Sequence, residues 1–350
     1  MYRHKHTGPH QKVFTPPGDQ RRKVDGSSDG PYSAIAHLTI HLGSNKYVGT
    51  GFLFKREAIG KERFVVLTAG HNLYDHNFKR HADAVVVRFG RNGTFNTGEI
   101  IKYADAFRVP SRSIQDHEEE YDFGMILLDI STDPIPHEYA FEPMVYADDD
   151  SVFAQVFMSG YPRRPRDGKD GMPGFPRGTQ WELEVNLEEM TDYHFLYKDA
   201  TTPGNSGSPV YWKIPILNKY VALGIHVTGG DFTGFNAATR ITMETLTEYI
   251  DVWLDFDDDD WVYYPWVDTS WLDVDDSERR KTWEKGLPPN ELASRAERLG
   301  CPAFNTGGAI KTHVMPKAEW FNLFSYDSGL LDSPRSYGMW IRWSHAKCMQ

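Results

Sequence analysis

The pattern of hydrophobic and polar positions changes near Tyr32. Residues 1–31 are polar and rich in Gly, Pro, Arg and Lys, so we expect a disordered tail there. From Tyr32 onward, short apolar runs alternate with turn residues, which indicates many short β-strands. The first set of expected strands covers residues 33–40, 51–54, 64–68, 84–89 and 124–128. Because no helical repeat lies between them, the pattern favours an all-β barrel or sandwich.

A second set of strands follows a polar connector at residues 131–150. Its expected members are residues 152–158, 181–185, 209–212 and 221–227. Two β-rich halves of similar size, joined by one connector, predict two packed barrels at about residues 32–130 and 151–240.

The β pattern ends at residue 241. Apolar side chains at spacings of three and four then predict a closing helix over residues 241–254. They are Leu246, Tyr249, Ile250, Trp253 and Leu254. Residues 256–350 form an irregular extension of unknown role, which begins with a run of four aspartates that we interpret as a solvated linker. The many tryptophans of the extension imply intramolecular packing, with the preceding β domain as the expected partner.

Composition excludes several classes of partner. The chain carries 49 acidic against 38 basic residues, a formal net charge of −11. Such a surface repels phosphate, so we expect neither a nucleic acid nor a membrane partner. The N-terminal residues lead into no apolar run and the only cysteines are Cys301 and Cys348, which favours an intracellular protein with reduced thiols.

Three local motifs carry residues suited to nucleophilic catalysis. An apolar strand ends on His71 in the sequence Leu-Thr-Ala-Gly-His, and Asp122 opens an apolar strand in Asp-Phe-Gly-Met-Ile-Leu. A glycine-rich turn, Gly-Asn-Ser-Gly-Ser-Pro, surrounds Ser206. A serine hydroxyl needs a histidine to take its proton, and a carboxylate fixes that histidine and stabilises its charged form. The chain order His, Asp, Ser argues against an α/β-hydrolase, in which the serine comes first.

The same turn provides candidates for stabilising a negative oxygen in the transition state. Glycine tolerates unusual dihedral angles, so the turn can aim backbone N–H groups at one point. We expect the N–H groups of Gly204 and Ser206 to form this oxyanion hole. The chemistry requires no metal and no organic cofactor, and we expect none.

These motifs resemble the His, Asp and Ser boxes of the trypsin/chymotrypsin superfamily. The form Gly-Asn-Ser-Gly-Ser-Pro, followed by Gly-Ile-His at residues 224–226, is most similar to the glutamyl endopeptidase or V8-like branch. The resemblance covers about residues 32–255 and implies two packed antiparallel six-stranded β-barrels. It also implies a serine endopeptidase that hydrolyses polypeptides through an acyl-enzyme intermediate.

Two departures from these families stand in the serine motif. Asn205 replaces the aspartate that pairs with a newly cut amino terminus in trypsin-like zymogens, so we expect no activation of that kind. Pro203 replaces a glycine of the V8-like pattern, but Gly204 keeps its own N–H group.

The resemblance also implies a substrate pocket. Thr201 and His226 match the V8-like residues that hold an acidic side chain, and Thr228 and Gly229 continue the same wall. A hydroxyl and an imidazole can both donate to a carboxylate, and an imidazolium adds charge. We therefore expect cleavage after Glu or Asp. The alternative for His226 is a core histidine bonded to backbone.

Two other functions stay open. The chain could be a non-catalytic or tightly regulated protease-fold protein that acts as a binding module. A housekeeping protease of the HtrA type would carry a β-rich PDZ module, and residues 256–350 lack that pattern.

Overall fold

The computed structural model describes most of the chain. The described residues are 20–26, 29–93, 99–129, 134–144, 155–163, 175–199, 201–214, 219–232, 234–265, 267–268, 287–316, 320–322 and 338–347. Residues 1–19 of the expected tail, much of the expected connector and Cys348 lie outside them.

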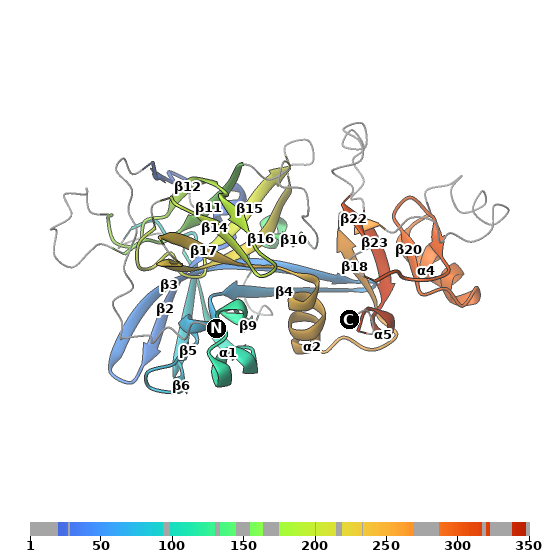
Figure 1. Cartoon of the computed structure of the whole chain (residues 1–350), viewed down its shortest axis with the longest axis horizontal. Helices are drawn as coiled ribbons and strands as arrows, with labels where there is room; N and C mark the ends of the chain where they lie inside the picture. Colours follow the sequence, from blue (N-terminus) through green and yellow to red (C-terminus); the bar gives the residue numbers. More distant parts are fainter. Residues whose placement is uncertain are drawn as a thin grey trace.

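The first half is a closed antiparallel barrel of six strands (Figure 1). They are β2 (Ile35–Leu42), β3 (Asn45–Ala58), β4 (Lys61–Thr68), β7 (Ala84–Phe89), β8 (Ile100–Arg108) and β9 (Gly124–Leu128). They pair in the order β2-β7-β8-β9-β4-β3, and β3 returns to β2. Their β-branched and aromatic residues fill one continuous core, which confirms the predicted fold class for this half.

The second half is a sheet that packs against the first barrel. Its strands are β10 (Glu142–Pro143), β11 (Gln155–Gly160), β12 (Trp181–Asn186), β13 (Glu189–Met190), β14 (His194–Tyr197), β15 (Pro209–Ile214), β16 (Lys219–Phe232) and β17 (Phe235–Arg240). Six of them run in the order β12-β11-β15-β16-β17-β14 around their own apolar core. The described strands leave this half-barrel open, and the whole is the chymotrypsin-like double-barrel arrangement.

The segment before Tyr32 differs from the predicted tail. Strand β1 (Arg22–Lys23) pairs antiparallel with β12, and Val24 is buried at 5% exposure. The prediction of disorder up to residue 31 is therefore wrong for residues 20–26. The reason is that backbone hydrogen bonds, which a polar sequence does not reveal, attach this segment to the edge of β12.

A helical segment follows the second half, where the apolar spacing predicted it. It comprises a π-helical turn, η5 (Thr245–Ile250), and α2 (Asp251–Trp253). Leu246 and Ile250 are fully buried in the core of the first barrel, so the helix links the two halves. Two shorter pieces, α1 (Ser111–Asp116) and η3 (Glu119–Tyr121), lie before β9.

The residues after 256 form a second group of elements at the far end of the β3–β4 hairpin (Figure 1). They are β18 (Trp261–Pro265), β19 (Val267–Asp268), α4 (Pro289–Arg298), β20 (Ala303–Asn305), β21 (Ile310–Lys311), β22 (Phe321–Asn322), β23 (Gly338–Arg342) and α5 (Trp343–Ala346). Strand β18 pairs with β3 through Ala58 and Val262 and with β23 along its length. No helix among the described residues has the length and apolar character needed to cross a membrane.

Candidate active site

His71 and Asp122 meet because of the pairing of two neighbouring strands. His71 lies in the short turn η2 (Gly70–Asn72) directly after β4, and Asp122 directly precedes β9. Thr68 of β4 is in register with Gly124 of β9, which brings the two strand ends together. Asp122 Oδ2 lies 2.7 Å from His71 Nδ1, and Oδ1 accepts the backbone N–H of His71 at 2.8 Å.

The two side chains tune each other's charge. Burial lowers the pKa of His71, but the charge and hydrogen bond of Asp122 outweigh it and raise the pKa above its usual 6.5. Burial raises the pKa of Asp122, but the attraction and hydrogen bonds of His71 outweigh it and lower the pKa. Asp122 therefore stays ionised and favours the protonated form of His71. A histidine that acts as a general base needs this support while it holds the proton.

The turn around Ser206 points its carbonyl groups away from the cleft. Thr202 O accepts the N–H of Asn205 at 3.1 Å, Gly204 O accepts the hydroxyl of Thr50 at 2.8 Å, and Ser206 O accepts the N–H of Thr50 at 2.9 Å. Among the described residues, no protein group accepts a hydrogen bond from the N–H of Gly204 or of Ser206. Both N–H groups stay the candidates for the expected oxyanion hole.

Glycine is required at both flanks of Ser206. Gly204 has a φ of +99°, and a Cβ there would lie 2.5 Å from Tyr161 O. Gly207 has a φ of +89°, and a Cβ would lie 2.0 Å from Thr50 O. The glycine-rich turn that the sequence shows is thus dictated by close approach to both halves of the protein.

Three polar residues of the first barrel hold the Ser206 turn, and sequence reasoning did not single them out. Besides its bonds to Gly204 and Ser206, Thr50 accepts through its backbone oxygen the hydroxyl of Thr68 at 2.7 Å. Asn72 donates to both Thr68 Oγ1 and Ser206 O at 2.9 Å. Thr68 and Asn72 lie close to His71 in the sequence. This closeness was the one feature of the sequence that could have marked them as residues of the site.

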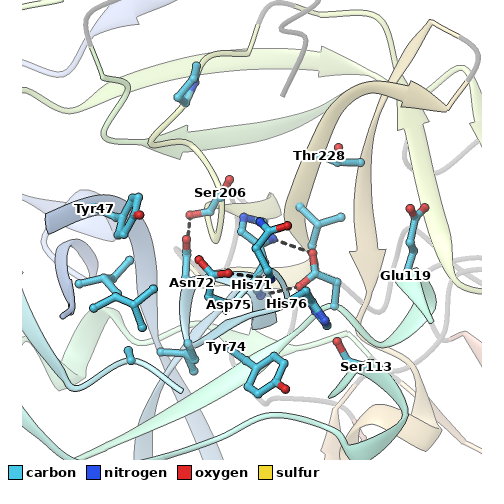
Figure 2. A pocket seen from close by; sticks show the side chains of 18 of the residues that line it. Tyr47, His71, Asn72, Tyr74, Asp75, His76, Ser113, Glu119, Ser206 and Thr228 are labelled. Carbon is cyan, nitrogen blue, oxygen red and sulfur yellow. Dashed lines mark hydrogen bonds and ion pairs between the residues drawn. The ribbon is translucent and has the colours of Figure 1, made fainter. Parts of the chain in front are cut away.

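His71, Asp122, Ser206 and Gly204 all open into one cleft of about 330 Å³ between the two halves. Figure 2 shows Ser206, His71, Tyr47 and Thr228 among the residues that line this cleft. Further lining residues of the first half include Ile40, Leu42, Val48, Ser113, His117 and Glu119, and the second half adds Pro203 and Val227. A mainly apolar cleft with a few convergent polar groups is typical of a substrate site.

The residues expected to bind an acidic side chain are divided between the cleft and the interior. Thr228 lines the cleft, and the backbone of Gly229 lies beside it on β16, opposite Asn236. Thr201 is 2% exposed and donates its hydroxyl to Asn236 Oδ1 at 3.0 Å. His226 is 3% exposed.

His226 is a neutral, fully engaged histidine. Its Nδ1 lies 2.5 Å from the hydroxyl of Tyr197, and the backbone of Ala237 offers a second hydrogen bond. Burial, and then the nearby His71, lower the pKa of His226 to about 3. Burial without a bonded carboxylate favours the neutral ring in this arrangement, and an imidazolium that binds an acidic substrate side chain stays a prediction.

The described residues contain no group of three or more His, Cys, Asp or Glu side chains that could hold a metal ion. The only described cysteine, Cys301, is free and buried, far from this cleft in the sequence. The expectation that the protein uses no cofactor stays a prediction.

Comparison with known proteins identifies relatives of this arrangement. No protein-family model matches the chain. Over 233 residues it is 30% identical to a glutamyl endopeptidase of Bacillus licheniformis, and the alignment covers 65% of each protein. The chain resembles the glutamyl endopeptidases. The resemblance inferred from the three motifs, to the V8-like branch of the chymotrypsin-like serine proteases, is thereby confirmed.

Two further matches are a solved structure and a second relative. A solved glutamyl endopeptidase structure superposes with a TM-score of 0.53 at 22% identity, covering 69% of this chain and 98% of that one, which shows the shared fold. An extracellular metalloprotease of Bacillus subtilis is 25% identical over 236 residues, or 65% of this chain and 66% of that protein. The chain thus spans about 65% of the length of the glutamyl endopeptidase of Bacillus licheniformis.

Proposed function

We propose that this protein is a serine endopeptidase with Ser206 as nucleophile, His71 as general base and Asp122 as the residue that orients His71. The observation that carries the proposal is one cleft containing all three side chains, with Asp122 bonded to His71 at 2.7 Å. The similarity to glutamyl endopeptidases supports the same chemistry.

The arrangement accounts for each step of peptide hydrolysis. Asp122 at Nδ1 leaves Nε2 of His71 as the base that takes the proton of the Ser206 hydroxyl while its oxygen attacks the carbonyl carbon. The carbonyl oxygen becomes negative and binds the N–H groups of Gly204 and Ser206. His71 then gives its proton to the departing amine, and the acyl-enzyme forms as the peptide C–N bond breaks. Water, deprotonated by His71, hydrolyses the acyl-enzyme and restores Ser206.

We further propose a preference for Glu or Asp before the scissile bond, set at the wall formed by Thr201, His226, Thr228 and Gly229. Thr228 lines the cleft in this wall, so its hydroxyl is the side chain of the four that a substrate reaches directly. The Thr201 hydroxyl donates to Asn236, and His226, which burial keeps neutral, pairs with the Tyr197 hydroxyl behind the wall. A neutral hydrogen bond discriminates less than a charge-assisted one. We therefore expect Glu to exceed Gln by about ten-fold in kcat/KM, about 1.4 kcal/mol.

The selectivity is tested with matched peptides that carry Glu, Asp, Gln, Phe or Lys before the scissile bond. His226→Ala should remove most of the difference between Glu and Gln while Ser206 stays reactive toward a small acylating probe. A preference for Phe or Lys, or a Glu preference that His226→Ala leaves intact, would show that the acidic pocket is misassigned.

The main alternative is a non-catalytic or regulated protease-fold protein that acts as a binding module. The test uses full-length protein, a quenched peptide library and Ser206→Ala as the matched control. Hydrolysis that is lost in Ser206→Ala and unchanged by a metal chelator supports the proposal. A folded protein without hydrolysis supports the binding module, and hydrolysis that the chelator abolishes supports a metal-dependent peptidase like the one named among the relatives.

A further inference from the structure

The segment at residues 20–24 lies along the edge of the second half, close to the turn that carries the oxyanion donors. In β1, Arg22 is in register with Glu182 and Lys23 with Trp181 of β12. Val24 continues the pairing by donating its N–H to Gln180 O at 2.9 Å. The segment is therefore held in place by backbone pairing from Arg22 to Val24.

Arg21 is the residue of this segment that reaches the active-site turn. Its side chain is buried, with the residue 8% exposed, and Nη1 donates to Thr202 Oγ1 at 3.0 Å. The guanidinium carbon lies 4.2 Å from the centre of the Phe175 ring. A buried guanidinium is costly unless it is bonded and stacked, so these contacts fix the side chain against Thr202.

Thr202 is the point at which the turn closes. Its carbonyl accepts the N–H of Asn205 at 3.1 Å, across a turn that contains Gly204. The next carbonyl, that of Pro203, accepts the N–H of Arg163 at 2.6 Å. Holding Thr202 therefore holds one end of the turn whose N–H groups face the cleft.

We propose that Arg21 is a positioning residue that keeps the oxyanion turn formed, supplied by the N-terminal segment without any chain cleavage. The inference rests on the proposed function and extends it. A turn held by an internal cation needs no new α-amine, and Asn205 offers no carboxylate to bind one. Arg21 thus belongs to the working active site, and loss of its guanidinium lowers turnover.

The experiment compares two variants of the full-length protein, Arg21→Gln and Arg21→Lys, with Lys23→Gln. Lys23 lies two residues further along the same segment with an exposed side chain, so Lys23→Gln removes one positive charge from the segment without touching the turn. Arg21→Gln should lower kcat at least ten-fold and leave KM within about two-fold, because the turn acts on the transition state. Arg21→Lys should recover part of kcat, and Lys23→Gln should stay within two-fold of the unmodified protein.

A second readout does not depend on activity. Amide hydrogen exchange in the peptide spanning residues 201–208 should quicken in Arg21→Gln and stay unchanged in Lys23→Gln. If the unmodified protein hydrolyses no peptide, the proposed function fails, and the exchange rates still test the role of Arg21. Equal exchange and equal kcat in Arg21→Gln and Lys23→Gln would overturn it. So would a loss confined to KM, or faster exchange throughout the barrels.

Discussion

Asp122 holds His71 through two separate oxygen atoms. Oδ1 accepts the backbone N–H of His71 at 2.8 Å, and Oδ2 lies 2.7 Å from Nδ1 of the ring. The first bond fixes where the residue sits, and the second fixes which ring nitrogen carries the proton. Gly70 allows Asp122 to approach this closely, because a Cβ at position 70 would lie 3.0 Å from Asp122 Oδ1. The unprotonated nitrogen is thus assigned by the fold to Nε2, on the side of the substrate.

The pKa of His71 predicts the direction of the pH dependence. Catalysis requires neutral His71, and Asp122 raises its pKa above 6.5. We therefore expect kcat/KM to increase with pH through a midpoint above 6.5 and to be low near about pH 5. A kcat/KM that is constant between about pH 5 and pH 8, in protein that stays folded, would contradict the role of His71.

Asp122→Asn should change both the rate and this midpoint. The amide cannot stabilise the imidazolium, so we expect kcat to fall by about 10⁴-fold near pH 7. Because the raising charge is gone, the pKa of His71 and the midpoint should also shift downward. Asp75→Asn is the matched control, since Asp75 lines the same cleft and accepts the nearby backbone N–H groups of Asn77 and Phe78. A comparable loss in both variants would mean that the effect is a general one of cleft charge.

Gly207→Ala should damage both stability and activity, and Gly60→Ala provides the matched control. Both glycines have positive φ, +89° and +76°, but a Cβ at Gly60 meets nothing within 4 Å. We expect Gly60→Ala to cost about 1–2 kcal/mol in the free energy of unfolding. Gly207→Ala adds a clash with Thr50 O, so we expect about 2–5 kcal/mol and a loss of kcat. Equal losses in chemical denaturation would show that the turn relaxes without cost.

Arg56 joins three parts of the chain through one buried ion pair. Its Nε and Nη2 each donate to Asp251 at 2.7 Å, and Nη1 donates to Tyr263 O at 3.0 Å. Both charged side chains are at most 1% exposed. Arg56→Ala leaves Asp251 buried and unpaired, so we expect a loss of about 3–5 kcal/mol in the free energy of unfolding.

The neighbouring residue supplies the control for that measurement. Lys55 pairs with Glu62 at 2.6 Å at the surface, with side chains 22% and 51% exposed. Lys55→Ala should cost about 0–1 kcal/mol. If Arg56→Ala were equally mild, the hairpin, the closing helix and β18 would not be coupled through this pair.

The candidate catalytic residues could be predicted from the sequence because each one stands in a local motif. Strand ends indicate His71 and Asp122, and a glycine-rich turn indicates Ser206, so these predictions need no knowledge of distant contacts. Thr50 and Arg21 could not be found in this way, since their partners in the Ser206 turn lie more than a hundred residues away. The neutral state of His226 was also hidden, because it depends on burial and on the Tyr197 hydroxyl from another strand.

The extension after residue 256 shows the same limit. Its tryptophans indicated packing, but only the register of Ala58 with Val262 shows where β18 meets the β3–β4 hairpin. A pairing between segments two hundred residues apart leaves no local pattern in either one. The boundary at residue 255 and the role of residues 256–350 stay predictions.

The central claim is that Ser206 is a nucleophile activated by His71, and the most direct measurement is its reaction with a fluorophosphonate probe. Mass spectrometry of the folded full-length protein should find one phosphonyl group per chain, on the peptide that contains Ser206. Labelling should be absent in Ser206→Ala and slower by orders of magnitude in His71→Ala, with the fold intact in both. A folded protein that takes up no label, or that is labelled equally well in Ser206→Ala, would contradict the account.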